Sequence, residues 1–495
     1  MDQFIIREDK QMSMLIAEIW ENQFFTGQWT KSEQTYQATE VATGEALGTF
    51  GYAQPKDIQT SAAQAKQAQA AWWALSYQER AQVFENAVQI TQNHKAEIIE
   101  WLVKESGSIF MKASFEVELC IQALKNAAAL PSSEQGSILP SQNGKLSLAK
   151  RVPLGVVGVI SPFNFPLYLA IRAVAPALAL GNAVVLKPDE RTAVCSGFAI
   201  ARIFELAGLP TGLLHVLPGG AEAGEALVNY PNIASIQFTG STEVGRIIGA
   251  GAGRTLKKVS LELGGKNSLL ILNDADIELA AQNIAWGVFL HSGQICMTSG
   301  KVLIHESIFE QVKNRLIEKV KQFKVGNPMD QQVNIGPLIN QKQCQRVEQL
   351  VQNAIAAGAK LEVGGVANGV FFEPTVLSQV HQDNPIFQQE IFGPVAVLIP
   401  FASDEEAIEL ANAGDYGLSA GIITSNVSHG MQVAQSLKVG LLHINDQTVN
   451  DETLNPFGGF GASGNGTRIG GPANADEFTQ WQWMTIQAQA PNYPF

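Results

Sequence analysis

The chain has 495 residues, of which 46% are hydrophobic and 16% charged, and its formal net charge is −13. This length exceeds what one hydrophobic core usually supports, so two or three structural units are expected. An acidic chain without a basic cluster argues against nucleic acid as a partner, because phosphates are bound by clustered Lys and Arg. The scattered cysteines, with no CxxC pair, indicate neither a disulfide framework nor a metal site. They are Cys120, Cys195, Cys296 and Cys344.

Targeting signals are not apparent. Residues 1–10 mix acidic and basic side chains where a secretory signal has a basic end followed by a long apolar run. The longest apolar stretch, residues 167–186, contains Arg172, Pro176 and Asn182, which a membrane-spanning helix tolerates poorly. The sequence therefore predicts a cytoplasmic protein with no membrane partner.

In chain order, the first regular pattern is helical: residues 57–104 carry apolar side chains at three- and four-residue spacings. From about Lys150 the pattern changes to short β-branched runs separated by helix-length segments. The first series lies at residues 155–160, 183–186, 214–217 and 233–238. A second series lies at residues 269–272, 302–304, 395–398 and 421–424. Strands alternating with helices predict an α/β fold with two buried parallel sheets.

Two flanking segments, residues 131–150 and 479–495, are predicted as edge strands. The second contains the aromatic, β-prone run 481–486, which would form an adhesive edge if it stayed unpaired. A strand of its own sheet or a strand of another subunit could cover this edge.

A glycine-rich run, FTGSTEVG at residues 238–245, follows an apolar strand and is expected to open a helix. Free backbone N–H groups and the positive helix end then favour a phosphate. The run matches neither GxGxxG nor a P-loop, since Arg246 and Ile247 stand where Lys and Ser or Thr are required. From the residues alone, a nucleotide site and an ordinary strand-to-helix turn both remain open.

The segment from Lys187 to Glu190 follows another predicted strand, at the sheet edge where α/β proteins bind ligands. A glutamate there can accept hydrogen bonds from both hydroxyls of a ribose. A surface ion pair between Lys187 and Glu190 is the alternative.

Three motifs carry groups suited to covalent oxidation of an aldehyde: SPFNFP at 161–166, LELGGK at 261–266 and HSGQICM at 291–297. A thiolate such as that of Cys296 adds readily to a carbonyl and departs readily from a thioester. The carboxamide of Asn164 suits an oxyanion. Glu262, between two leucines, is expected to have a raised pKa and to act as a base. Taken singly, the three residues also fit a buried thiol, a turn residue and a solvated carboxylate.

In this order the motifs resemble those of the aldehyde dehydrogenase superfamily over nearly the whole chain. The resemblance implies that an ionised Cys296 is the nucleophile, that Glu262 is the general base, and that Asn164 and the Cys296 N–H stabilise the oxyanion. Relatives that transfer the acyl group to coenzyme A generally lack this glutamate, so release of a free acid is expected. The resemblance also implies a dinucleotide site formed by Ile160, Lys187, Glu190, Gly220, Gly240, Ser241, Val244, Leu263, Glu390 and Phe392.

Within that site, Glu390 is expected to hold the nicotinamide ribose, with Phe392 near the ring. Glu190 is expected to repel the extra phosphate of NADP, so NAD is the expected cofactor and NADP the less favoured one.

The family architecture implies a dinucleotide-binding domain with a Rossmann-type sheet, a catalytic domain and a small β extension. The first covers residues 1–130 and 151–260, and the second residues 261–445, with a loop at 446–478 returning to the active site. Residues 131–150 and 479–495 form the extension, which is expected to join subunits into homodimers or homotetramers.

Residues 439–451, 457–466 and 478–483 resemble the branch that contains benzaldehyde, vanillin and salicylaldehyde dehydrogenases. Phe165 and Phe457 are then flat walls for an aromatic ring, or else core residues. Arg172, about two helical turns beyond Asn164, lines the tunnel mouth or forms a structural ion pair. A semialdehyde or broad aliphatic aldehyde dehydrogenase stays open, with Arg172 binding a carboxylate. An inactive dinucleotide-binding scaffold is the non-enzymatic alternative, although no catalytic position is replaced.

Overall fold

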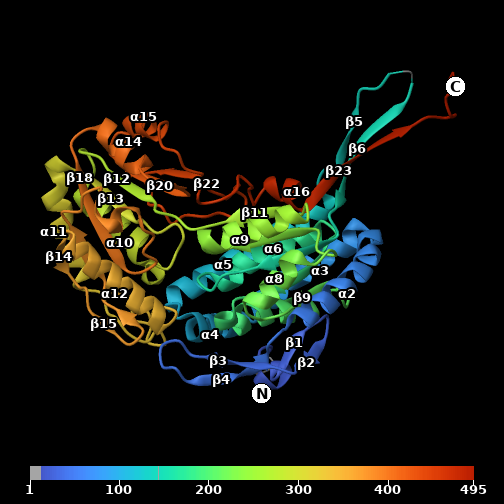
Figure 1. Ribbon diagram of the computed structural model, residues 1–495, viewed down its shortest axis with the longest axis horizontal. Helices are drawn as coiled ribbons and strands as arrows, with labels where there is room; N and C mark the ends of the chain where they lie inside the picture. The colour runs from blue at the N-terminus through green and yellow to red at the C-terminus, as the bar shows by residue number, and fades with distance from the viewer. Residues whose placement is uncertain (1–12, 143, 495) are drawn as a thin grey trace, which may run out of the picture.

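The computed structural model describes residues 13–142 and 144–494. Two seven-stranded sheets form the centres of two α/β units that lie side by side (Figure 1). The α/β fold predicted from the two strand series is confirmed. The N-terminal run used to predict the cellular location lies outside the described residues.

The first sheet has the order β11-β10-β7-β8-β9-β1-β2. Its parallel strands are β7 (Val156–Ile160), β8 (Ala183–Lys187), β9 (Leu214–Val216), β10 (Ser235–Thr239) and β11 (Lys258–Glu262). An antiparallel hairpin of β1 (Gln23–Phe25) and β2 (Trp29–Lys31) extends one edge, and a separate hairpin joins β3 (Thr35–Thr39) and β4 (Ala46–Gly51). The sequence analysis missed both hairpins.

Helices pack around this sheet, and they include the predicted helical region. They are α1 (Ala17–Trp20), α2 (Pro55–Ala74), α3 (Tyr77–Asn93), α4 (Lys95–Ser106), α5 (Phe110–Ala129), α6 (Pro166–Ala179), α7 (Ala199–Leu206), α8 (Ala221–Asn229) and α9 (Thr242–Arg254). Every residue of α6 is buried, which explains why this segment is rich in apolar residues. None of the described helices has both the length and the apolarity that a membrane crossing requires.

The second sheet has the order β14-β17-β18-β13-β12-β20-β21. Its strands are β12 (Ser268–Ile271), β13 (Lys301–His305), β14 (Lys360–Val363), β17 (Thr375–Ser378), β18 (Val395–Phe401), β20 (Ser419–Ile423) and β21 (Leu441–Ile444). All neighbours pair in parallel except β14 with β17. Two apolar clusters pack against this sheet with helices α10 (Ile277–Phe289), α11 (Phe309–Val320), α12 (Gln341–Ala356), α13 (Pro385–Gln388), α14 (Asp404–Asn412) and α15 (Val427–Ala434).

Smaller elements complete the fold. Two-stranded pairs join β15 (Ala367–Asn368) with β16 (Phe371–Phe372), and β19 (Tyr416–Gly417) with β22 (Phe460–Gly461). A three-stranded antiparallel arm contains β5 (Gly136–Leu139), β6 (Leu146–Pro153) and β23 (Thr479–Ile486), which follows α16 (Ala473–Phe478). The arm projects from the body of the molecule (Figure 1). Strand β23 therefore pairs within its own sheet, and its outer edge is open in this chain.

Candidate active site

A cavity of about 500 Å³ is lined by residues from both α/β units. The first unit contributes the turn after β7 and the start of α9, and the second contributes α12 and the segment before β18. Seven of the residues predicted from the sequence line it: Asn164, Gly240, Ser241, Leu263, Cys296, Glu390 and Phe392. Segments more than 200 residues apart in the chain thus meet at one site.

The two glycines after β11 allow the chain to approach other groups closely. A Cβ atom on Gly264 would lie 2.6 Å from Oε2 of Glu390, and one on Gly265 would lie 2.5 Å from the Cys296 carbonyl oxygen. The Gly265 N–H donates to Oε1 of Glu390 at 3.0 Å. The glycine pair therefore brings Glu390 and the Cys296 loop together, which a larger residue at either position would prevent.

The Cys296 loop turns through strained backbone. His291 and Ser292 have φ values of +50° and +54°, in the left-handed region that non-glycine residues rarely occupy. Gly293 follows with φ +68°, and a Cβ atom there would lie 2.1 Å from the Gly393 carbonyl oxygen. Gly293 thus permits a close approach to Gly393, and the loop leaves Cys296 partly exposed.

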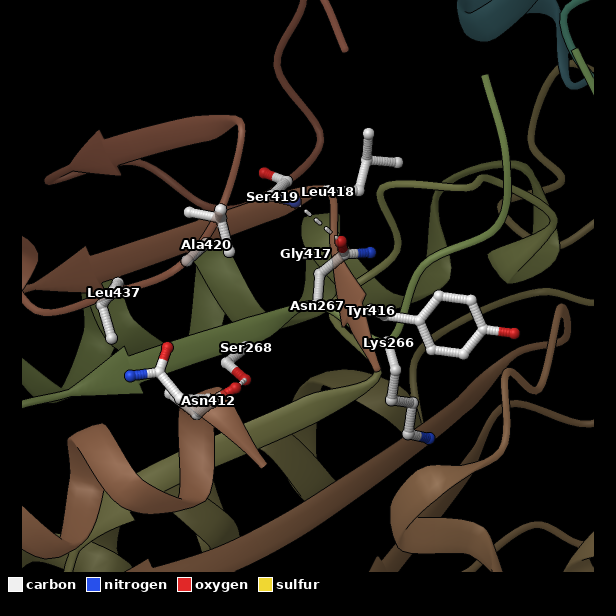
Figure 2. A pocket seen from close by; sticks show the side chains of 12 residues that line it. Lys266, Asn267, Ser268, Asn412, Tyr416, Gly417, Leu418, Ser419, Ala420 and Leu437 are labelled. Atoms are coloured by element: carbon white, nitrogen blue, oxygen red, sulfur yellow. Dashed lines mark hydrogen bonds between the residues drawn. The ribbon is translucent and has the colours of Figure 1, made fainter. Parts of the chain in front are cut away.

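Asn267 fixes this loop and was not found by the sequence analysis. Its Nδ2 donates to the carbonyl oxygens of Cys296 and Thr298, both at 2.8 Å, and its Oδ1 accepts the Ser419 N–H at 3.0 Å. Figure 2 shows the carboxamide of Asn267 facing Ser419, with Lys266 beside it. Asn267 follows the GGK motif at the start of β12, and no local pattern distinguishes it from an ordinary polar residue.

The Cys296 thiol is protonated near neutral pH. Burial raises its pKa to about 12, with the Glu390, Glu262 and Asp451 carboxylates adding to the effect and the Arg172 guanidinium opposing it. Burial, and after it the surrounding carboxylates, thus oppose the ionised thiol that the sequence predicts, and the role of Cys296 as nucleophile stays a prediction. The remaining cysteines are all buried, as expected of inert thiols.

Glu262 ends β11 in an apolar environment, and neither of its carboxyl oxygens has a hydrogen-bond partner among the described residues. Burial raises its pKa to about 8, and Arg172 and Arg468 oppose the shift. This is the direction that the flanking leucines predict. An unpaired buried carboxyl is costly to fold, so its presence beside Cys296 indicates a functional group.

The other predicted cofactor residues do not line the 500 Å³ cavity, although Arg191, next to Glu190, does. Lys187 is buried, and its Nζ lies 3.9 Å from Oε2 of Glu190. Gly220 approaches the Tyr52 hydroxyl, and Ile160 ends β7 beside Lys187. Val244 lies in the first turn of α9, where its N–H donates to the Ser241 side chain at 3.4 Å.

The three predicted substrate residues are buried. The Arg172 guanidinium lies over the Phe457 ring at 4.3 Å and pairs with Asp451 at 2.9 Å. The Tyr168 hydroxyl also donates to Asp451, at 3.1 Å. Arg172 thus forms the ion pair that was the structural alternative, yet it also interacts electrostatically with Glu262 and Cys296.

Phe165 and Phe457 have different surroundings. Phe165 packs against the His291 ring, with the ring centroids 6.2 Å apart. Phe457 lines a separate cavity of about 360 Å³, together with Asp451 and His443. Within residues 13–142 and 144–494, no cluster of three His, Cys, Asp or Glu side chains is placed to hold a metal ion.

The carboxyl edge of the first sheet presents the N-terminus of α9 and the unpaired Glu262 carboxyl, and Cys296 of the second unit lines the same cavity as Ser241. This combination is typical of a dinucleotide-dependent α/β oxidoreductase. The sequence pattern of the aldehyde dehydrogenase family matches residues 29–484. The chain belongs to this family, and it oxidises an aldehyde with a nicotinamide dinucleotide as the electron acceptor.

Similar proteins extend over the whole chain. A vanillin dehydrogenase from an Amycolatopsis species is 51% identical over 98% of this chain and 100% of its own length. An NAD-dependent benzaldehyde dehydrogenase from Pseudomonas putida is 46% identical over 96% of this chain and 98% of its own. The solved NAD complex of a Bacillus cereus aldehyde dehydrogenase is 32% identical, with a TM-score of 0.92 over 96% of this chain and 98% of that one. The predicted family is confirmed, and the inactive scaffold is not supported.

Proposed function

We propose that the enzyme oxidises aromatic aldehydes to free carboxylic acids, with NAD as its preferred acceptor and Cys296 as its nucleophile. The observation that carries the proposal is the single cavity shared by Cys296, Asn164 and Glu390, with the unpaired Glu262 carboxyl close enough to influence the thiol.

Glu262 is the base that activates the nucleophile. Its pKa of about 8 leaves a fraction of the carboxyl ionised near neutral pH, whereas the Cys296 thiol is protonated. Transfer of the thiol proton to Glu262 releases a thiolate, and Arg172 stabilises the negative charge on either group. The thiolate then adds to the aldehyde carbon.

Addition places negative charge on the former carbonyl oxygen. The Asn164 side chain lines the cavity, and within the described part of the chain the Cys296 N–H enters no backbone hydrogen bond. Both groups can therefore donate to the oxyanion. One such donor contributes about 10²–10³-fold to the rate in comparable enzymes.

The residues around the cavity fit NAD, which accepts the hydride when bound. The N-terminus of α9 at Ser241 would hold the diphosphate, Glu390 the nicotinamide ribose, and Phe392 the ring face. Once hydride has left, Cys296 carries a thioester. Glu262 first gives the thiol proton to solvent, and its carboxylate then takes a proton from the water that attacks the thioester. Expulsion of the sulfur, which takes that proton from Glu262, releases the acid and restores the thiol.

The preference for NAD rests on Glu190, which would bind the adenosine ribose together with Lys187. Its partly exposed carboxylate would oppose the second phosphate of NADP. The other cation of that segment, Arg191, is held by both oxygens of Asp189, at 2.7 and 2.6 Å. Arg191 therefore offers little to an added phosphate.

An aromatic substrate is supported by the relatives and by Phe457, which is stacked on Arg172 and lines the 360 Å³ cavity. We propose this cavity as the site of the ring. Because Asp451 already neutralises Arg172, the structure does not favour Arg172 as the partner of a substrate carboxylate. The names of the vanillin and benzaldehyde dehydrogenases agree with this substrate class.

We also propose that the chain forms homodimers or homotetramers through the arm. The outer edge of β23 is open, and its side chains Trp481 and Trp483 are 55% and 72% exposed. Strand β21 is likewise a sheet edge, so β23 of a second copy could add to it. Sedimentation analysis tests the proposal, and a monomer at micromolar concentration contradicts it. The four unpaired cysteines support a reducing cytoplasm as the working compartment.

NADH formation tests the substrate and the cofactor together. We expect the highest kcat/KM with benzaldehyde-type substrates and NAD, and lower values with aliphatic aldehydes, succinate semialdehyde and NADP. Faster turnover of a semialdehyde contradicts the aromatic proposal, and equal kcat/KM with NAD and NADP contradicts the role of Glu190.

A further inference from the structure

A buried ion pair on α5 contacts the segment that contains Asn164. Lys112 and Glu116 are one helical turn apart, their side chains are 0% exposed, and Nζ lies 2.5 Å from Oε2. A buried ion pair seldom stabilises a fold by itself, because the cost of removing two charges from water offsets their attraction. The hydrogen bonds that Lys112 and Glu116 form with other residues therefore indicate what the pair does.

Those contacts converge on the segment that begins with Asn164. Lys112 Nζ donates to the Asn164 carbonyl oxygen at 2.7 Å. Glu116 Oε1 accepts the N–H groups of Leu167 and Tyr168 at 2.9 and 3.1 Å. The pair thus holds the chain from Asn164 into the first turn of α6.

The start of α6 depends on this pair. Pro166 occupies the first position of the helix and has no N–H to donate, and Phe165 before it makes no side-chain cap. Glu116 replaces the missing cap from a neighbouring helix, and its negative charge suits the positive helix end. The Lys112 ammonium also lies 4.0 Å from the centre of the Phe165 ring.

We propose that Lys112 and Glu116 are positioning residues that set the place of the Asn164 carboxamide in the cavity. The proposal rests on the oxyanion role of Asn164 proposed above. Within the described residues the Asn164 side chain forms no hydrogen bond of its own, so its placement depends on its backbone. An oxyanion donor acts over a narrow range of distances, and a misplacement of about 1 Å costs on the order of 10²-fold in rate.

A double-mutant cycle on kcat/KM tests the proposal. Its arms are Asn164→Ala, the charge-free pair Lys112→Met with Glu116→Gln, and all three changes together. We expect a loss of about 10²–10³-fold for Asn164→Ala and of about 10–10²-fold for the pair. The triple variant should lie within about threefold of Asn164→Ala, because the pair acts through that residue.

The matched control is Lys104→Met with Glu100→Gln, which removes an exposed ion pair of the same spacing from α4. It should leave kcat/KM unchanged. The affinity for NAD should stay within about twofold in every variant, and Lys112→Arg, which keeps a cationic donor, should recover most of the activity. Lys112→Arg can be measured even if the variant with both Lys112→Met and Glu116→Gln does not fold. If the activity of Lys112→Arg is no higher than that of Asn164→Ala, the result counts against the proposal.

Two other results overturn it. Pair variants with wild-type kcat/KM show that Asn164 is placed without Lys112 and Glu116. A triple variant whose loss equals the product of the separate losses shows that the pair acts elsewhere. Wild-type kcat/KM in Asn164→Ala alone is a different result, since it removes the oxyanion role of Asn164 from the proposed function.

Discussion

The two sides of Cys296 are built differently. On the cofactor side, the cavity depends on close backbone approach at Gly264 and Gly265 and on the helix N-terminus at Ser241. On the other side, a cluster of long side chains fills the space: Tyr168, Arg172, Asp451 and Phe457. The first arrangement is fixed by short contiguous motifs, whereas the second depends on pairs of residues far apart in the chain.

The two regions therefore suit different ligands. Backbone contacts are the same whatever side chains surround them, so they suit a cofactor that all family members share. Side-chain pairs can be exchanged without moving the backbone, so they suit a substrate that varies. The reacting groups Cys296 and Glu262 stand between the two regions and respond to charges in both.

The largest effect should come from Cys296→Ser. A hydroxyl is a far weaker nucleophile than a thiolate, so we expect kcat to fall by about 10³-fold or more. The affinity for NAD, measured by quenching of protein fluorescence, should remain close to that of the wild type, because the cofactor side keeps its backbone contacts. Wild-type turnover in this variant would remove the covalent mechanism altogether.

Glu262→Gln should have the next largest effect. Loss of a general base typically costs about 10²–10⁴-fold. If Glu262 mainly activates water, rapid-mixing measurements should show a burst of NADH no larger than one per active site, followed by slow turnover. If its main task is to deprotonate Cys296, the burst itself is slow. A variant with unchanged steady-state rates contradicts both roles.

The pH dependence of the wild type provides a smaller but independent measure. Glu262 acts in its ionised form, and its pKa is about 8, so kcat/KM should rise about tenfold per pH unit below pH 8 and level off above it. A profile that is flat from pH 6 to 8 contradicts this assignment. An inflection in the profile belongs to Glu262 only if Glu262→Gln abolishes it.

The free energy of unfolding should fall as the pH rises, whereas kcat/KM should rise. In the unfolded chain the Glu262 carboxyl has the ordinary glutamate pKa of 4.5, whereas in the folded chain its pKa is raised to about 8. The unfolded state therefore binds fewer protons between these values, and this group lowers the free energy of unfolding as the pH rises. The difference in melting temperature, Glu262→Gln minus wild type, should accordingly be larger at pH 8 than at pH 5.

The sequence predicted the parts of the molecule that are encoded locally. The two α/β units follow from β-branched runs spaced by helices, and the raised pKa of Glu262 follows from its flanking leucines. The raised pKa of the Cys296 thiol could not be predicted, because it comes mainly from burial in the folded chain, with Glu390 and Asp451 from distant segments adding to it. The division into domains and the roles of the site residues remain predictions.

The residues that were missed share one property: their partners are distant in sequence. Asp451 lies 279 residues from Arg172, and Asn267, just before β12, lies 29 residues from Cys296. Only Lys112 and Glu116 could have been recognised from the sequence, because two charged residues at helical spacing on an otherwise apolar helix face are unusual.

The smallest effect should come from Arg172→Leu made together with Asp451→Asn, which removes both charges and avoids leaving one buried without its partner. If this cluster selects the substrate, the order of kcat/KM among benzaldehyde, salicylaldehyde and vanillin should change. Differences of about 10-fold between rings are expected, as for other contacts of about 1–2 kcal/mol. Arg151→Leu, which removes another stacked guanidinium at the base of the arm, should preserve the order. If the order is also preserved in the double variant, Arg172 is a structural ion pair, and ring selection lies with Phe165 and Phe457.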